Sequence, residues 1–306
     1  MAPATNRPPT WRIWLLAARP ATLAASIVPV VVGTAAATPL ARVTLPVFAA
    51  ALLTSVAIQV GTNFANDVAD FRRGADTAER LGPTRVTQSG LVSPRQVLVA
   101  TYLVFALAAL LGSYLVAVGG WPILVAGALA IVAGVTYTSG PWPFGYHALG
   151  DVVCFLFFGM LGVLGSAYLQ TLTLTLTLAL TPRATLASLS VGCLVTAILV
   201  VNNLRDIPTD RLVGKRTLAV LLGPGGTRVE FVALILGAYL VPPVMWVVGQ
   251  GGLALWLPWL TLPLAVRLLR RVASAQGRGL NAALKETGQL HLLFGLLFAA
   301  GLFVQR

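Results

Sequence analysis

The chain has 306 residues, of which 57% are hydrophobic and 10% are charged, and its mean hydropathy is +0.86. Soluble domains carry about 25% charged residues, so this composition excludes an ordinary soluble protein. The formal net charge of +12 would suit a nucleic-acid binder, but in so apolar a chain we attribute most of it to loops beside a membrane. We therefore predict contact with a lipid bilayer and no nucleic-acid partner.

Apolar runs fill most of the chain, and several are as long as the roughly 20 residues that a helix needs to cross a bilayer. The runs are continuous rather than alternating, which excludes a β-barrel and leaves helices as the spanning elements. We predict an all-α polytopic membrane protein in which one domain, residues 1–306, forms a bundle of nine transmembrane helices. The predicted spans are Pro20–Leu40, Val43–Ala65, Val97–Gly119, Trp121–Ser139, Val152–Gln170, Ala184–Leu204, Val229–Gly249, Leu253–Leu269 and Thr287–Val304.

The distribution of charge orients these spans. All but three of the 21 Lys and Arg residues fall on the side that holds the N-terminus, the exceptions being Arg42, Arg183 and Arg306. The positive-inside rule makes that side cytoplasmic. All nine acidic residues fall on the same side. The rule does not require this, so the acidic residues indicate a functional site at the cytoplasmic face.

Two polar clusters close the second and sixth spans, at corresponding ends. Asn66 and Asp70 are four residues apart, as are Asn202 and Asp206, and this spacing places side chains on one face of a helix. Clusters of oxygen ligands without His or Cys suit a hard cation such as Mg²⁺, which combines one or two carboxylates with phosphate oxygens. Neighbouring bases would balance the charge of a diphosphate. The clusters contain Asn63, Asn66, Asp67, Asp70, Arg72 and Arg73, and Asn202, Asn203, Asp206, Asp210, Lys215 and Arg216.

A purely structural interpretation would make these residues helix caps at the membrane interface. It explains Asn66 and Asn202 poorly, because both lie inside apolar runs where an unpaired amide is penalised. The matching clusters also predict a loose internal repeat, with one copy in residues 11–139 and the other in residues 149–305.

The sequence resembles the UbiA superfamily of intramembrane prenyltransferases over nearly its whole length. Within that superfamily it is most similar to the branch that prenylates 1,4-dihydroxy-2-naphthoate in menaquinone biosynthesis. One departure concerns the spacing Asn-x-x-x-Asp-x-x-x-Asp of the wider superfamily, because position 74 is Gly and the next acid is Asp76, whose role stays open. The matching stretches are 19–23, 66–77, 82–90, 137–141, 145–151 and 202–218.

The resemblance implies an enzyme that uses Mg²⁺ to transfer a polyprenyl chain from its diphosphate to 1,4-dihydroxy-2-naphthoate, with loss of the acceptor carboxylate. The Ala- and Arg-rich composition indicates a bacterial source, and with the orientation above we expect a bacterial plasma membrane and an active site that faces the cytoplasm. For the metal the resemblance implies Asn66, Asp67, Asp70, Asn202, Asp206 and Asp210. For the diphosphate it implies Arg72 or Arg73, with Lys215 and Arg216. For the acceptor it implies Asn63, Arg85, Gln88 and Tyr137, and for catalysis Asp70, Asp206 and Tyr137.

Three other functions compete with this one. Another aromatic acceptor, such as 4-hydroxybenzoate, would need the same chemistry. A membrane transporter could also have nine helices and an internal repeat, although its acids would be expected near mid-membrane rather than at one face. A CDP-alcohol phosphotransferase would need an Asp-Gly-x-x-Ala-Arg run, which the sequence lacks.

Overall fold

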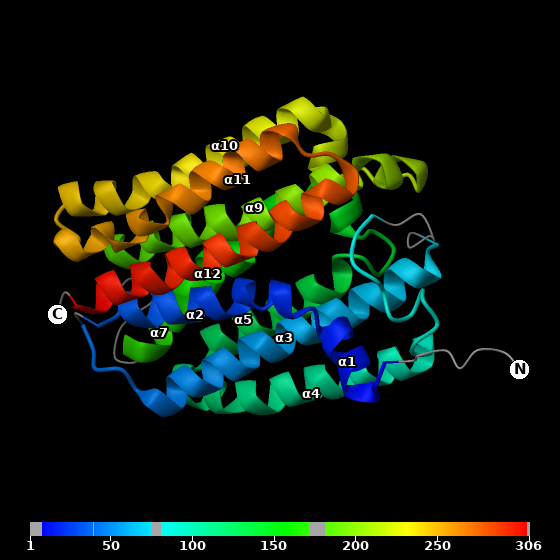
Figure 1. The fold of residues 1–306 in the computed structure, drawn as a ribbon. Coiled ribbons are helices and arrows are strands. Elements are labelled where there is room, and N and C mark those ends of the chain that lie inside the picture. The colour runs from blue at the N-terminus through cyan, green and yellow to red at the C-terminus, as the bar shows by residue number, and fades with distance from the viewer. Residues whose placement is uncertain (1–7, 39, 75–80, 172–180, 305–306) are drawn as a thin grey trace, which may run out of the picture.

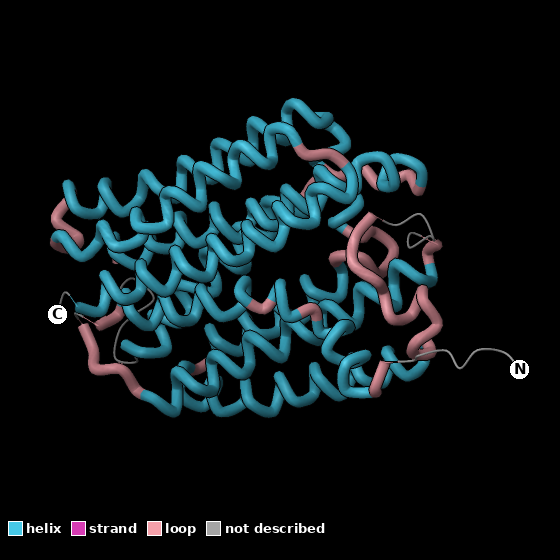
Figure 2. Tube along the Cα trace, viewed as in Figure 1, coloured by secondary structure: helices cyan, strands magenta, loops and turns pink. Residues whose placement is uncertain are grey.

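The computed structural model describes residues 8–38, 40–74, 81–171 and 181–304. These residues form helices joined by loops, with no strand among them (Figure 2), which confirms the predicted all-α class. The α-helices are α1 (Thr10–Ala18), α2 (Ala24–Ala36), α3 (Leu45–Arg72), α4 (Pro94–Gly119), α5 (Trp121–Thr136), α6 (Gly150–Cys154), α7 (Gly162–Thr171), α9 (Pro182–Leu212), α10 (Leu218–Val247), α11 (Leu262–Ser274) and α12 (Leu280–Val304). Shorter helical segments are η1 (Pro20–Thr22), η2 (Phe144–Tyr146), η4 (Leu253–Thr261) and η5 (Gly277–Gly279), and η3 (Phe155–Leu161) is a π-helix.

Seven helical stretches in the described ranges are long and apolar enough to cross a membrane. They correspond to the predicted second, third and fifth to ninth spans. The predicted first span corresponds to two helical pieces bent by 51°, which would make an eighth crossing. The predicted fourth span corresponds to α5, whose 16 residues fall short of the length that usually spans a bilayer. The chain is thus a multi-pass helical membrane protein, and the ninth crossing and the cytoplasmic N-terminus stay predictions.

Local sequence signals set where two of the long helices begin. The side chain of Ser93 accepts a hydrogen bond from the backbone N–H of Gln96, whose side chain accepts one from the backbone N–H of Ser93. This capping box satisfies two of the donors that a helix start leaves open. The hydroxyl of Thr181 likewise accepts from the backbone N–H of Ala184 at the start of α9.

Helix α9 is the centre of the bundle. It packs against α2, α7, α10 and α12, and 67% of its apolar window is buried, against 17% for α4. The large side chains of Leu194, Phe231 and Phe294 fill the core between these helices. Leu103 and Leu110 of α4 are instead two-thirds exposed. In a membrane protein such a leucine-rich surface is expected to face lipid, which places α4 at the periphery.

One end of the bundle, which we call the loop end, gathers the loops 81–93 and 137–149. Helices α3 and α9 both finish there (Figure 1). The backbone N–H of Arg216, just beyond α9, donates a 3.0 Å hydrogen bond to the carbonyl of Tyr146. The ends of the second and sixth predicted spans are therefore brought to one region, although about 140 residues separate them along the chain.

Two glycines let the π-helix η3 approach α9 closely. A Cβ atom built on Gly159 would lie 2.4 Å from the Cα of Gly192, far inside van der Waals contact. Small residues are the usual means by which membrane helices pack with their backbones near each other. Since η3 follows α6 directly and α9 carries the second polar cluster, this contact fixes the spacing of two walls of the site described below.

We expect Gly159→Ala to lower the thermal midpoint of the purified protein in detergent, because overpacking of this kind costs about 1–3 kcal/mol. The matched control is Gly165→Ala in the following helix, where an added Cβ has no neighbour within 4 Å. That change should leave the midpoint equal or slightly higher, since Ala is a better helix former than Gly. Equal midpoints for the two variants would contradict the close contact between η3 and α9.

Candidate active site

A cavity of about 760 Å³ runs through the bundle between α2, α3, α4, α5, α7 and α9. On α3 its wall extends from Asp70 at the loop end to Ala51, roughly 28 Å at 1.5 Å per residue. The polar lining of the loop end comprises Asn63, Asn66, Asp70, Arg85, Asn202, Asp206, Asp210 and Lys215. The far end is lined by apolar side chains that include Val30, Ala51, Leu115, Leu124 and Leu169.

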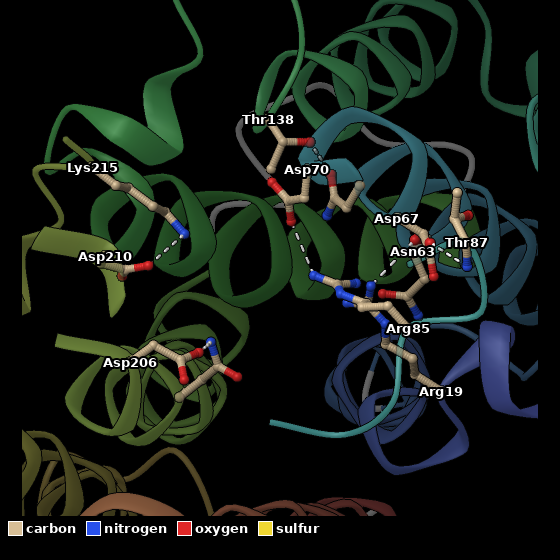
Figure 3. A network of polar contacts seen from close by, with 12 residues as sticks. Arg19, Asn63, Asp67, Asp70, Arg85, Thr87, Thr138, Asp206, Asp210 and Lys215 are labelled. Atoms are coloured by element: carbon tan, nitrogen blue, oxygen red, sulfur yellow. Dashed lines mark hydrogen bonds and ion pairs between the residues drawn. The ribbon is translucent and has the colours of Figure 1, made fainter. Parts of the chain in front are cut away.

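Helix α3 supplies one polar wall. The side-chain oxygen of Asn66 accepts a 2.7 Å hydrogen bond from the hydroxyl of Thr138. Asp70, one turn further on, forms a 3.0 Å ion pair with Arg85 from the loop 81–93, and its other oxygen accepts from the hydroxyl of Tyr146 at 3.2 Å. Both partners hold the Asp70 carboxylate in place, and Figure 3 shows it directed into the space between the two helices.

Helix α9 supplies the opposite wall. Arg205 donates to both oxygens of Asp206, at 2.7 and 2.6 Å, and to the side-chain oxygen of Asn202 at 2.8 Å. Its remaining nitrogen donates to Asn281 of α12 at 2.9 Å. The guanidinium of Arg205 is almost fully buried, so this network fixes the rotamers of Asn202 and Asp206 at the cavity wall.

Asp210 lies one turn beyond Asp206. One of its oxygens is 3.6 Å from the ammonium of Lys215, and the pair lies across the open space from Asp70 (Figure 3). The other oxygen, Oδ2, is buried with no hydrogen-bond partner among the described residues. Buried polar atoms are nearly always satisfied, so an oxygen of this kind beside a cavity is suited to a ligand.

Tyr146 joins three groups of the site. Besides its hydrogen bond to Asp70, its ring lies 5.5 Å from the guanidinium of Arg73 and 5.3 Å from the ammonium of Lys215, within cation–π range. Burial, and then the nearby charge of Asp70, raises the pKa of Tyr146 well above its ordinary value. The hydroxyl therefore remains a hydrogen-bond donor throughout the neutral pH range.

Asp67 points away from the cavity. Its two oxygens accept hydrogen bonds from the backbone N–H groups of Val86 and Thr87, at 3.3 and 3.2 Å, and its side chain is almost fully buried. This carboxylate anchors the loop 81–93, which in turn carries Arg85 to Asp70. Of the two acids in the first cluster, Asp67 therefore anchors a loop, whereas Asp70 lines the cavity.

Some of the other predicted site residues line the cavity, and others do not. Tyr137 lines the cavity, and Asn63 lines it while donating to the carbonyl of Ala18 at 2.9 Å. Arg72 and Arg216 are exposed and Gln88 is half-buried, and these three residues are not part of the lining. Asp76 lies outside the described residues.

Sequence reasoning singled out neither Arg205, Tyr146 nor Thr138 as a site residue. All three lie in stretches that carry the family resemblance, which is the signal that could have found them. Arg205 is also an arginine in the last turns of a predicted span, where an unpaired charge would be costly. Arg19, which lines the cavity beside Asn63, has a left-handed backbone with φ of 52°, a conformation that is uncommon outside glycine.

The donor set fits a hard cation bound together with a diphosphate. Asn66, Asp70, Asp206 and Asp210 offer oxygens from two walls of one cavity, and Oδ2 of Asp210 is unsatisfied. The described side chains contain no group of three or more His, Cys, Asp or Glu that could hold a metal without other ligands. Since Mg²⁺ usually takes one or two carboxylates and completes its shell with phosphate oxygens and water, the arrangement suits joint binding.

Proteins with assigned names resemble the chain over nearly its whole length. The chain is 36% identical to the 1,4-dihydroxy-2-naphthoate octaprenyltransferase of Escherichia coli, over 96% of each chain. It is 37% identical to the protein of the same name from Mycobacterium tuberculosis, over 94% of this chain and 96% of that one.

Two solved structures share the fold. A UbiA homolog from Aeropyrum pernix superposes with a TM-score of 0.71 at 20% identity, over 92% of this chain and 97% of that one. A UbiA homolog from Archaeoglobus fulgidus bound to DMAPP and Mg²⁺ superposes with a TM-score of 0.65 at 15% identity, over 95% and 99%. Residues 26–293 match the model of the UbiA prenyltransferase family, and the protein therefore belongs to that family.

Proposed function

We propose that this protein transfers a polyprenyl chain from polyprenyl diphosphate to 1,4-dihydroxy-2-naphthoate with loss of CO₂, forming the demethylmenaquinone skeleton in menaquinone biosynthesis. The observation that carries the proposal is the asymmetry of the cavity. Carboxylates, amides and bases from two helices meet at one end, and an apolar channel long enough for several isoprene units continues from them. The names of the relatives at 36 and 37% identity support the choice of acceptor.

The polar end would bind the diphosphate. Asn66, Asp70, Asn202, Asp206 and Asp210 are the residues that would hold Mg²⁺, which neutralises a diphosphate and makes it a better leaving group when bound. Lys215 and Arg85 line the cavity from opposite walls and would contact the remaining phosphate oxygens. Arg73 lies outside the lining and donates to the carbonyl of Gly140, so it would have to leave that hydrogen bond to join them. The proposal leaves out Asp67, because its oxygens already accept two backbone hydrogen bonds.

The chain's own groups then orient the reaction. The hydroxyl of Tyr146 and the guanidinium of Arg85 fix the Asp70 carboxylate, and Arg205 fixes Asp206, so the site is preorganised before the diphosphate arrives. Asn63 and Tyr137 line the cavity next to these groups and would contact the aromatic ring. Apolar walls exclude water, which would otherwise capture the allylic cation left by the departing diphosphate.

The topology supports a location as well as a reaction. The asymmetric distribution of Lys and Arg supports a cytoplasmic location for the loop end, and the relatives named above come from bacteria. We therefore place the protein in a bacterial plasma membrane, with its active site accessible to a soluble aromatic acid from the cytoplasm and to a prenyl diphosphate from the bilayer.

The direct test is turnover by purified protein in detergent, with a long-chain prenyl diphosphate and 1,4-dihydroxy-2-naphthoate. We expect release of CO₂ and diphosphate together with the prenylated naphthalenediol, abolition by EDTA, and recovery on addition of excess Mg²⁺. Product from 4-hydroxybenzoate but not from the naphthoate would contradict the assigned acceptor. An absence of turnover with every aromatic acceptor would contradict the enzyme function itself.

A second test separates the two neighbouring acids of the first cluster. Asp70→Asn should lower the turnover of the folded protein by about 100-fold or more, because it removes a charge that faces the bound diphosphate. It also breaks the buried ion pair with Arg85, so its thermal midpoint should fall as well. Asp67→Asn keeps one accepting oxygen and should mainly lower the free energy of unfolding, by about 1–2 kcal/mol. The protein that remains folded should retain most of its turnover. Equal losses of turnover in the two variants would contradict the distinction between loop anchor and cavity residue.

A further inference from the structure

The acid Asp151 has no part in the site as described, although its neighbours in α6 line the same cavity. It is the second residue of α6, and only 4% of its surface is exposed. Three of its close neighbours in sequence, Gly150, Val153 and Cys154, line the cavity. Asp151 therefore lies immediately behind the cavity wall, outside the set of carboxylates that face the diphosphate.

The surroundings of Asp151 connect it to Tyr137. A Cβ atom built on Gly150 would lie 3.5 Å from the ring and 3.6 Å from the hydroxyl of Tyr137, so the start of α6 packs against that side chain. Asp151 interacts electrostatically with Tyr137 and Cys154, and also with the acid Glu230 of α10. The nearest walls of the cavity, which include Phe157 and Leu199, are apolar, and a charge acts over a longer range in such an environment than in water.

The charge of Asp151 differs from that of the other cavity acids in being uncompensated. Asp70, Asp206 and Asp210 each have a basic partner, whereas Asp151 takes part in none of the ion pairs found in the described ranges. One of its oxygens, Oδ1, is buried without a hydrogen-bond partner. A buried, unpaired carboxylate costs stability, which indicates that a function maintains it.

A structural role accounts for only part of this arrangement. An acid in the first turn of a helix is stabilised by the helix dipole, which explains how the buried charge is tolerated. It does not explain why the acid is buried behind the cavity rather than solvated, nor why its Oδ1 is left without a partner. A reaction that develops positive charge nearby would explain both.

Resting on the proposed function, we propose that Asp151 is a charge-stabilising residue, whose negative charge behind Tyr137 and Cys154 favours the allylic cation formed in the cavity. The bond between the allylic carbon and the diphosphate oxygen breaks, and its electron pair leaves with the diphosphate. The ring carbon that bears the carboxylate then supplies the electron pair of the new C–C bond. Its bond to the carboxylate breaks, that electron pair returns to the ring, and CO₂ leaves, so the ring carbon exchanges no proton.

This location complements the charges of the diphosphate site. The acids of α3 and α9 lie beside bases and would also face the cations that bind the diphosphate. These positive charges largely cancel the electric field of the acids at the allylic carbon. Asp151 approaches from α6, on the wall formed by Gly150 and Cys154, where no described base lies beside it. Its charge is therefore available to the carbon end of the breaking bond, and a unit charge at such a position changes a rate by about tenfold or more.

The test compares ligands that differ only in charge. Asp151→Asn should lower kcat by about tenfold or more and weaken, by a similar factor, binding of an ammonium analogue of the allylic cation in the presence of diphosphate and Mg²⁺. Binding of the neutral isostere, with carbon in place of nitrogen, and of a non-ionisable prenyl thiolodiphosphate should stay unchanged. A purely structural change would affect all three ligands alike.

Two further variants keep the result interpretable. Glu286→Gln removes a half-buried carboxylate of α12 that is outside the cavity lining, and it should leave the preference for the ammonium analogue intact. Asp151→Ser, which suits a helix start, replaces Asp151→Asn if the latter lowers the thermal midpoint strongly. Wild-type preference in both Asp151 variants, or equal weakening of all ligands, would overturn the proposal. Wild-type protein that neither turns over nor binds the thiolodiphosphate would instead overturn the proposed function.

Discussion

Three carboxylates at the loop end of an apolar bundle need compensating positive charge, and the local structure supplies a base beside each of them. Asp70, Asp206 and Asp210 are paired with Arg85, Arg205 and Lys215 respectively. A buried ion pair contributes little net stability, because the desolvation of both charges offsets their attraction. Breaking such a pair is nonetheless costly, so Arg85 and Lys215 hold their chain segments beside the cavity.

Arg85 comes from the loop 81–93 and Lys215 from just beyond α9, whereas Arg205 is the neighbour of Asp206 on α9 itself. Arg85 reaches Asp70 only because Asp67 anchors the loop 81–93 through the backbone of Val86 and Thr87. Arg205 extends the arrangement to α12 through Asn281, whose amide donates to the carbonyl of Leu81 at 2.9 Å. The loop that covers the first cluster is thus also connected to the helix that carries the second. A cavity enclosed in this way keeps its polar groups oriented before a ligand binds.

Much of the site follows from helix geometry, and the rest depends on tertiary contacts. The four-residue spacing of Asn66 and Asp70 predicts a shared face, and the structure confirms it. The same geometry turns Asp67 by about 100°, so its separate direction could have been predicted too. No spacing rule predicts that Arg85 pairs with Asp70, or that Tyr146 lies between two bases, because those contacts join segments far apart in sequence.

The fold, too, could be predicted from the sequence only in part. Hydropathy located the long apolar helices and their order, because burial in lipid requires length and apolar composition. It could not show the bend within the first predicted span, nor that α5 is only 16 residues long. The internal repeat of residues 11–139 and 149–305 stays a prediction, supported by the corresponding positions of the two clusters at the ends of α3 and α9.

The central claim is that the clusters of α3 and α9 act on one diphosphate. A double-mutant cycle with Asp70→Asn and Asp206→Asn, read out as Mg²⁺-dependent binding of a prenyl thiolodiphosphate, tests it most directly. If both residues serve the same ligand, the double variant should lose much less binding free energy than the sum of the single variants, with a coupling energy of at least about 0.5 kcal/mol. Losses that add within about 0.3 kcal/mol would mean that the two clusters act independently, and would contradict the account.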